Sequence, residues 1–158
     1  LKSNNTGDML MKSKLLWESD GQRIFAVVFD PQDEVAAGLQ AFARESHATS
    51  ASFTAIGALS DVTLGYFEME RKDYKRIQIS EQVEVLSLVG NIALHSDKPK
   101  IHAHLVVGKR DGTAHGGHLL EAHVRPTLEV IVTETPQHLQ RRHDEETGLA
   151  LIRIGSMR

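Results

Sequence analysis

The sequence predicts a single α+β domain, built on a mostly antiparallel sheet with one main helix. One segment has the hydrophobic periodicity of a helix, and seven or eight others have the composition of strands. Most of these strands follow one another through short turn signals, which favours antiparallel pairing because parallel strands need a long crossover. The 158 residues, 41% of them hydrophobic, are enough to form one packed core.

The chain begins with a polar, aperiodic stretch at residues 1–10, which predicts a tail or leader outside the packed domain. The domain itself is expected to span residues 11–158. Its first strand is predicted over residues 23–29, where Arg-Ile-Phe-Ala-Val-Val-Phe forms a nearly continuous apolar run.

The main helix is expected directly after this strand, over residues 31–46. Asp30 is the predicted N-cap and Pro31 the first helical residue, because an aspartate side chain accepts free backbone N–H groups and proline fits the first turn. Three large apolar residues then recur at helical spacing: Val35, Leu39 and Phe42.

The remaining strands are predicted from alternating or continuous apolar runs that end at turn residues. Gly57 ends the first of these runs, and Ser96–Pro99 is a turn signal further along the chain. Residues 136–143 are expected to form a helical turn. The predicted strands span residues 51–56, 62–70, 74–79, 82–94, 100–107, 128–133 and 149–154.

Composition and charge argue against several classes of protein. The 18 Lys and Arg residues against 21 Asp and Glu give a net charge of −3, which argues against a dedicated nucleic-acid-binding protein. The absence of cysteine excludes disulfides, thiolate metal ligands and cysteine nucleophiles. No apolar run approaches about 18 residues, so no membrane span is expected. Without a basic-then-apolar leader, the expected location is cytoplasmic.

Histidine is unusually frequent, with nine in the chain and five of them between His102 and His123. His102 and His104 lie two residues apart in the predicted strand 100–107, so their side chains point to the same face. The apolar residues between and beside them then face the core. Two imidazoles on one strand face can share a metal ion with little strain.

A third histidine is expected to join this pair across a hairpin. Asp111–Gly112 is the turn signal, and Gly116–Gly117 lacks two Cβ atoms that would keep backbones apart. This arrangement would carry His118 over the face of His102 and His104. Three imidazoles with one open position are typical of zinc, and other divalent transition metals also fit. The predicted metal site is therefore His102, His104 and His118.

The cluster also fits a simpler interpretation, in which hydrogen-bonded histidines form a polar seam or a subunit interface. The residues themselves leave both interpretations open. His115 and His123 are weaker candidates for the site, and His95 is expected at its rim or behind its ligands. The other three are expected at a helix end or in solvent: His47, His138 and His143.

Several of these segments resemble the plant and prokaryote conserved domain, abbreviated PPC. The most specific part is the order His-x-His at 102–104, Asp-Gly at 111–112 and Gly-Gly-His at 116–118. The resemblance extends over residues 23–154. One departure is His123, where a small residue is expected in this family. Three further segments carry the resemblance: 53–62, 82–91 and 128–132.

This resemblance implies an α+β fold on an antiparallel sheet and a homotrimer. It also implies a zinc ion held by His102, His104 and His118, in agreement with the strand-face argument. Plant members join the domain to AT-hook motifs that contact DNA, whereas no Arg-Gly-Arg-Pro core occurs here. Three copies of a chain with charge −3 would carry −9, so net charge does not support DNA as a partner.

The sequence leaves three functions open. The first is a metal-binding homotrimer with a DNA-associated or regulatory role. The second is a zinc-dependent hydrolase or lyase that binds a small molecule at the metal, with Glu68, Glu84 or Glu121 as general base. The third is a non-catalytic binding or assembly module. No nucleophile or substrate motif favours the second, so the sequence does not predict an enzyme.

Overall fold

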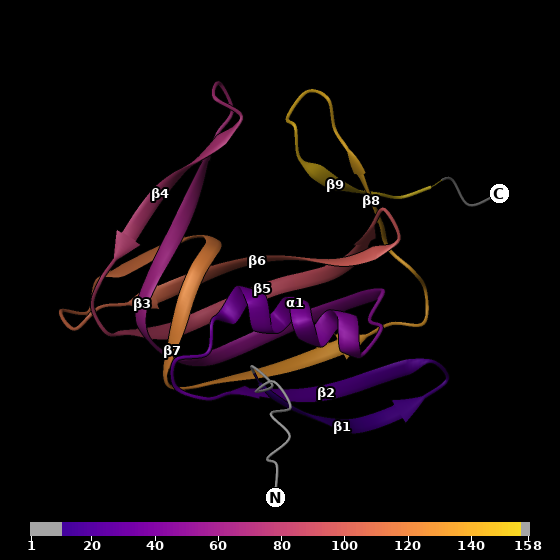
Figure 1. Cartoon of the computed structure of the whole chain (residues 1–158), viewed down its shortest axis with the longest axis horizontal. Helices are drawn as coiled ribbons and strands as arrows, with labels where there is room; N and C mark the ends of the chain where they lie inside the picture. The colour runs from indigo at the N-terminus through magenta and orange to yellow at the C-terminus, as the bar shows by residue number, and fades with distance from the viewer. Residues whose placement is uncertain (1–10, 156–158) are drawn as a thin grey trace, which may run out of the picture.

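The computed structural model describes residues 11–155, and the predicted tail at 1–10 lies outside them. One helix, α1 (Val35–Glu45), lies against a nine-stranded sheet in the described chain (Figure 1). This confirms the α+β prediction. The strands are β1 (Lys12–Ser19), β2 (Gln22–Phe29), β3 (Ser50–Glu68), β4 (Asp73–Ile79), β5 (Val83–His95), β6 (Lys98–Gly108), β7 (Ala114–Glu134), β8 (Gln140–His143) and β9 (Ala150–Arg153).

The strand order is β1-β2-β7-β3-β5-β8-β9, with β4 paired to β3 and β6 paired to both β5 and β7. Every pairing is antiparallel except the short parallel contact between β5 and β8. Because β3 pairs with β5 and β7 while β6 also joins β5 to β7, these four strands form a closed circuit of hydrogen bonds. That circuit holds β6 and the start of β7 side by side.

Helix α1 begins later than the sequence predicts. Glu34 is its N-cap, and its carboxylate accepts the backbone N–H groups of Ala36 at 3.1 Å and Ala37 at 2.6 Å. A carboxylate there satisfies two of the free N–H groups of the first turn and interacts favourably with the helix dipole.

The prediction of Asp30 as N-cap and Pro31 as first helical residue was therefore wrong. These residues belong to a turn in which Gln32 adopts a φ of 78°, which a helix does not allow. The backbone N–H of Gln32 donates to the carbonyl oxygen of Val124 at 2.8 Å, so the turn is held against β7. A tertiary hydrogen bond therefore overrides the local helix-start signal.

The predicted strand 51–56 and most of the predicted strand 62–70 are parts of the single strand β3, which ends at Glu68. Gly57 does not end the strand but marks a shift of its register with β5 and β7. A Cβ atom at Gly57 would collide with the carbonyl oxygen of Thr127, so glycine is required by the close approach of β7. The late strand 128–133 is likewise only the end of the longer β7.

The helical turn expected at 136–143 was also wrong, because residues 140–143 form β8. The N–H of Leu94 donates to the carbonyl oxygen of Leu139 at 2.7 Å, and β8 then pairs with the end of β5 and with β9. Strand β1 was not predicted, because three consecutive large apolar residues, Leu15, Leu16 and Trp17, are exposed and give no alternating pattern.

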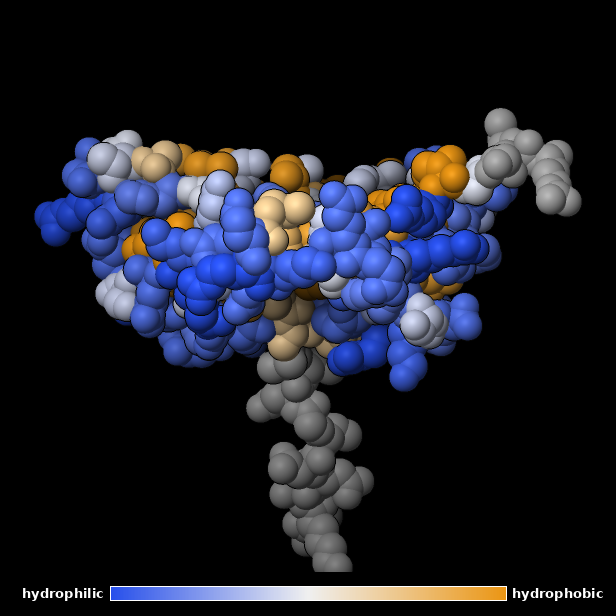
Figure 2. Space-filling view, turned by 90° about the horizontal axis from the view of Figure 1, so that it is seen from above, coloured by the Kyte–Doolittle hydropathy of each residue, from blue (hydrophilic) through white to orange (hydrophobic). Residues whose placement is uncertain are grey.

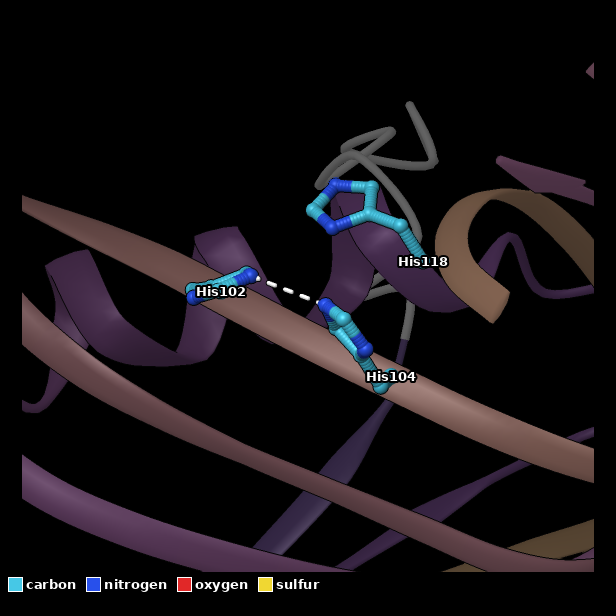
Figure 3. A group of neighbouring side chains, drawn as sticks. All are labelled: His102, His104 and His118. Carbon is cyan, nitrogen blue, oxygen red and sulfur yellow. Dashed lines mark hydrogen bonds between the residues drawn. The ribbon is translucent and has the colours of Figure 1, made fainter. Parts of the chain in front are cut away.

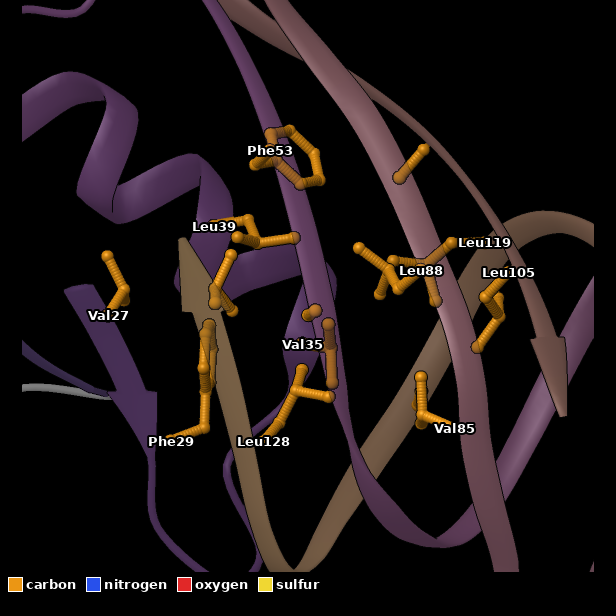
Figure 4. Packing of buried hydrophobic residues seen from close by; sticks show 14 of the residues in the cluster. Val27, Phe29, Val35, Leu39, Phe53, Val85, Leu88, Leu105, Leu119 and Leu128 are labelled. Carbon is orange, nitrogen blue, oxygen red and sulfur yellow. The ribbon is translucent and has the colours of Figure 1, made fainter. Parts of the chain in front are cut away.

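The hydrophobic core lies between α1 and the inner face of the sheet (Figure 4). Leu39 of α1 packs in the same cluster as Phe29, Phe53, Leu88 and Leu128 from four different strands. Burial of these side chains stabilises the fold by roughly 1.5–3 kcal/mol each. No helix among residues 11–155 is long and apolar enough to cross a membrane.

The opposite face of the sheet also carries apolar side chains, and these are exposed. Figure 2 shows hydrophobic residues gathered along its upper edge, on the side away from α1. We call this set the outer apolar face. It consists of Ile56, Leu86, Val89, Val106 and Ile131, which are 40–63% exposed.

Candidate metal centre

Strand β6 positions the first two histidines. His102 and His104 alternate with Ala103 and Leu105, which are buried in the core. Since successive side chains of a strand point to opposite faces, the burial of the two apolar residues turns both imidazoles to the other face. This confirms the predicted strand face.

The β6–β7 hairpin positions the third histidine, His118. The N–H of Lys109 donates to the carbonyl oxygen of Thr113 at 2.9 Å, and Gly112 takes a φ of 83° that favours glycine. The resulting register places His104 directly opposite His118 in the antiparallel pair. The predicted turn at Asp111–Gly112 is thus confirmed, and it carries His118 to the other two histidines.

Gly117 allows β7 to approach β3 closely beside the cluster. A Cβ atom at this position would lie 2.8 Å from the carbonyl oxygen of Gly65, a separation that real Cβ atoms essentially never show. At Gly116 the closest contact would be 3.3 Å, to a methyl group of Val106. The close approach of Gly117 fixes the strand that carries His118.

The three imidazoles form a compact, nearly regular triangle (Figure 3). One ring nitrogen from each of His102, His104 and His118 lies within 4.8 Å of the other two. The ring centroids are 4.9, 5.2 and 5.3 Å apart. The Nε2 atoms of His102 and His104 are 3.1 Å apart, which is also a hydrogen-bonding distance.

This arrangement fits a tetrahedral metal ion. Two nitrogens at ~2.0–2.1 Å from zinc lie roughly 3.3 Å apart at the tetrahedral angle. The Nε2 atoms of His102 and His104, 3.1 Å apart, are close to this spacing. Nδ1 of His118 is buried and has no hydrogen-bond partner among the described residues. Such an unpaired polar atom is costly, and an ion or an ordered water would compensate it. The donor set therefore fits zinc or a similar divalent ion.

Burial and the neighbouring charges favour the neutral imidazoles that metal binding requires. Desolvation by burial, followed by the proximity of His102 and His104, lowers the pKa of His118 to about 4. Burial also lowers the pKa of His102, and His104 adds to the effect. At neutral pH both rings are therefore available as ligands.

Tyr74 of β4 lies on the cluster, with its ring stacked on His118 at 4.7 Å and an interplanar angle of 25°. Burial raises the pKa of the Tyr74 hydroxyl. No sequence pattern predicts this contact, because Tyr74 lies far from His118 along the chain. A pocket of about 190 Å³ opens between Tyr74, the two histidines His102 and His118, and the hairpin formed by β8 and β9.

The weaker histidine candidates lie elsewhere. His123 contacts Asp61, with its Nδ1 atom 2.9 Å from a carboxylate oxygen, and it is not part of the three-histidine group. His115 is exposed near Thr113. His95, near the end of β5, has a buried Nδ1 atom that finds no hydrogen-bond partner within residues 11–155. His138 and His143 are exposed, as expected.

None of the carboxylates considered as a general base joins the three-histidine group within residues 11–155. Glu68 forms a salt bridge with Arg71, and Glu121 forms one with Arg76. Glu84 lines a separate hollow together with Gly108. The enzyme hypothesis requires one of the three carboxylates to reach the metal, and these positions do not meet that condition.

The fold and the site define a class of protein: a small, mostly antiparallel α+β domain with three histidines gathered at a strand hairpin. The family model of the Plants and Prokaryotes Conserved domain, abbreviated PCC or PPC, matches residues 18–136. The chain belongs to this family.

Two solved structures share the fold. A "putative DNA-binding protein" from Bacteroides thetaiotaomicron is 28% identical, with a TM-score of 0.82 over 91% of this chain and 97% of that one. The metal-containing protein AF0104 from Archaeoglobus fulgidus is 34% identical, with a TM-score of 0.76 over 83% and 93%. The bifunctional protein GlmU of Synechococcus sp. (strain JA-3-3Ab) is 28% identical over 136 residues, 84% of this chain but 20% of GlmU. The chain thus spans a fifth of that relative.

Proposed function

We propose that this chain is a metal-binding homotrimer in which His102, His104 and His118 hold zinc or another divalent transition metal. The observation that carries the proposal is the convergence of three imidazole nitrogens within 4.8 Å of one another. The name of the Archaeoglobus relative, a metal-containing protein, supports it.

A zinc ion with three protein ligands keeps one position open, where it polarises a bound small molecule or lowers the pKa of bound water. This chain's own residues shape the space around that position. Tyr74 covers one side of His118, and the pocket beside it is lined by Ile101 and Leu151. The function proposed at this position is binding of a small molecule. No carboxylate of residues 11–155 belongs to the three-histidine group, where it could act as the general base of a hydrolase or lyase.

The outer apolar face supports the homotrimer. Contiguous exposed apolar surface of this kind is typical of a subunit contact. Val89 of this face lies directly opposite His104 in the pairing of β5 with β6, and Val106 follows His104 by two residues on β6. The three-histidine cluster is therefore on the same side of the sheet, at the border of the proposed subunit contact.

A DNA-associated role is the second candidate, and the name of the Bacteroides relative favours it. The charge distribution gives little support. The sequence has short basic pairs at 71–72, 75–76 and 109–110. One residue of each pair forms a salt bridge with a glutamate: Arg71, Arg76 and Lys109. A mobility-shift titration of mixed-sequence duplex at low salt tests this role. Binding that weakens as salt increases supports it, and an unshifted duplex removes it.

Cobalt(II) tests the metal proposal, because tetrahedral cobalt absorbs visible light more strongly than the hexahydrate ion. The metal-free protein is titrated with Co²⁺ and then with Zn²⁺. We expect a visible band that saturates near one cobalt per chain and disappears when zinc is added. His118→Ala should abolish the band, whereas His138→Ala, which removes an exposed histidine, should leave it unchanged. A band unaffected by His118→Ala contradicts the proposed ligand set.

A further inference from the structure

The pocket beside the histidines is closed on one side by the hairpin of β8 and β9. In Figure 1 this hairpin and the β3–β4 hairpin both project beyond β6 on the same side. The family match ends at residue 136, so the hairpin belongs to the part of the chain beyond it. The pocket has a volume of about 190 Å³ and is lined by Tyr74, Lys100, Ile101, His102, His118, Arg141, Leu149, Ala150 and Leu151.

Arg141 is the unusual residue of this lining. It is only 6% exposed, although arginine is rarely buried without a charged partner. Its guanidinium donates to the side-chain oxygen of Asn91 and, at 3.0 Å, to the carbonyl oxygen of Ala150, and both acceptors are neutral. Nε of Arg141 is buried without a partner among the described residues. No carboxylate of residues 11–155 forms a salt bridge with it.

A buried guanidinium without a counter-charge is unfavourable, and a bound anion would neutralise it. The lining supports this interpretation, because it includes a second cation, Lys100, and no acidic residue. Arg141 presents a planar donor group that suits the two oxygens of a carboxylate. The charge balance of the pocket therefore favours a ligand that carries a negative group.

The rest of the lining favours a ligand with an apolar part as well. Ile101, Leu149 and Leu151 are aliphatic, and Tyr74 adds an aromatic ring. A volume of about 190 Å³ corresponds to about six water molecules at ~30 Å³ each, so the ligand is small. A short aliphatic acid meets all three conditions of charge, polarity and size, whereas a phosphate ion would leave the apolar walls uncovered.

We propose that this pocket binds a small organic carboxylate, whose carboxylate group pairs with Arg141 and whose apolar part lies against Leu149 and Leu151. Lys100 adds a second, more exposed positive charge. The inference deepens the proposed metal function by naming the class of its small-molecule ligand. It rests on that function only where the ligand would contact a metal held by His102 and His118. The contact with Arg141 needs no metal.

Calorimetric titration with sodium butyrate tests the proposal, in metal-free and in zinc-loaded protein. Butyramide is the uncharged control and inorganic phosphate is the anionic control. We expect butyrate to bind the wild-type protein at least tenfold more tightly than either control. Arg141→Met should weaken butyrate at least tenfold, since it removes a charge-assisted contact. Lys100→Met should weaken it severalfold, and Arg142→Met, which changes an exposed arginine on the same strand, should have no effect.

Several results would overturn the proposal. One is equal binding of butyrate and butyramide, and another is butyrate binding that Arg141→Met leaves unchanged. Tighter binding of phosphate than butyrate would assign the pocket to phosphoryl ligands instead. If the wild-type protein does not bind butyrate while Arg141→Met dissociates the oligomer, the guanidinium pairs with a neighbouring subunit instead of a ligand. Circular dichroism checks that each variant is folded, and Lys100→Met keeps the test valid if Arg141→Met disrupts the hairpin.

The two metal states separate this inference from the proposed metal function. Arg141-dependent butyrate binding in a protein that takes up no zinc would support the pocket and contradict the metal site. Zinc uptake without butyrate binding in either state would support the metal site and contradict the pocket.

Discussion

His104 and His118 lie directly opposite each other in the pairing of β6 with β7, with their ring centroids 5.3 Å apart. Their proximity is set by the register of one hairpin, whose turn residues are Lys109–Thr113. His102 joins them because it lies two residues before His104 on the same strand face. The cluster is thus a direct consequence of strand geometry, and changes in that geometry should change metal binding.

The close approach at Gly117 provides the first prediction. Gly117→Ala places a methyl group 2.8 Å from the carbonyl oxygen of Gly65, so β7 must move away from β3. We expect the free energy of unfolding to fall by about 1–3 kcal/mol and metal affinity to fall with it. Urea denaturation and zinc titration measure the two effects. Gly116→Ala, which meets its nearest neighbour at 3.3 Å, is the matched control and should cost less. Equal effects of the two substitutions would contradict this account.

The lowered pKa of His118 predicts how the stability of the metal-free protein depends on pH. His118 takes up a proton near its ordinary pKa of 6.5 in the unfolded chain, but only near pH 4 in the folded protein. The unfolded state therefore binds more protons in this interval, so stability decreases as pH falls from 6.5 towards 4. Denaturation of metal-free protein across this range should show the decrease, and His118→Gln should make it smaller. An unchanged pH dependence in the variant would rule out His118 as its source.

The pKa of His123 is shifted in the opposite direction from that of His118, so its effect on stability should have the opposite pH dependence. Its hydrogen bond to Asp61 raises the pKa of His123, so the stabilisation is present below pH 6.5 and is lost as pH rises through the raised value. Asp61→Asn removes the negative charge and should return the pKa of His123 towards 6.5. NMR titration of the imidazole protons measures this change. Glu121→Gln, which removes a more distant charge, should produce a smaller decrease, and a larger one would show that Asp61 is not the main cause.

The outer apolar face should determine the oligomeric state. Ile56 is 63% exposed on this face, and a glutamate there would place a charge in the proposed subunit contact. If the chain forms the proposed homotrimer, Ile56→Glu should convert it to monomers in light scattering coupled to size-exclusion chromatography. Tyr66→Glu is the control, since Tyr66 lies on the same strand with a similar exposure of 65% but outside this face. A monomeric wild-type protein would contradict the homotrimer itself.

The geometry of the histidine cluster was largely predictable from the sequence, because it depends on local rules. Alternation along 100–107 oriented His102 and His104, and the turn at Asp111–Gly112 determined which residues of the next strand face them. Both rules act over a few residues, and no knowledge of the rest of the fold was needed.

The surroundings of the cluster were not predictable in this way. Tyr74 reaches His118 from β4, and Arg141 reaches the pocket from β8, through pairings between distant segments. The predicted start of the helix was wrong for the same reason, because Gln32 is held by a hydrogen bond to Val124 on β7. Long-range pairing also joined two predicted strands into β3, where the sequence shows only an interruption at Gly57.

Metal content tests the central claim most directly. The protein is purified without a polyhistidine tag, offered zinc, dialysed and analysed by elemental mass spectrometry beside a His102→Ala/His104→Ala double variant. We predict about one zinc ion per chain in the wild-type protein and none above background in the double variant. A wild-type protein that retains no metal, or a double variant that retains as much as the wild type, would contradict the metal site and leave the three histidines as a hydrogen-bonded seam.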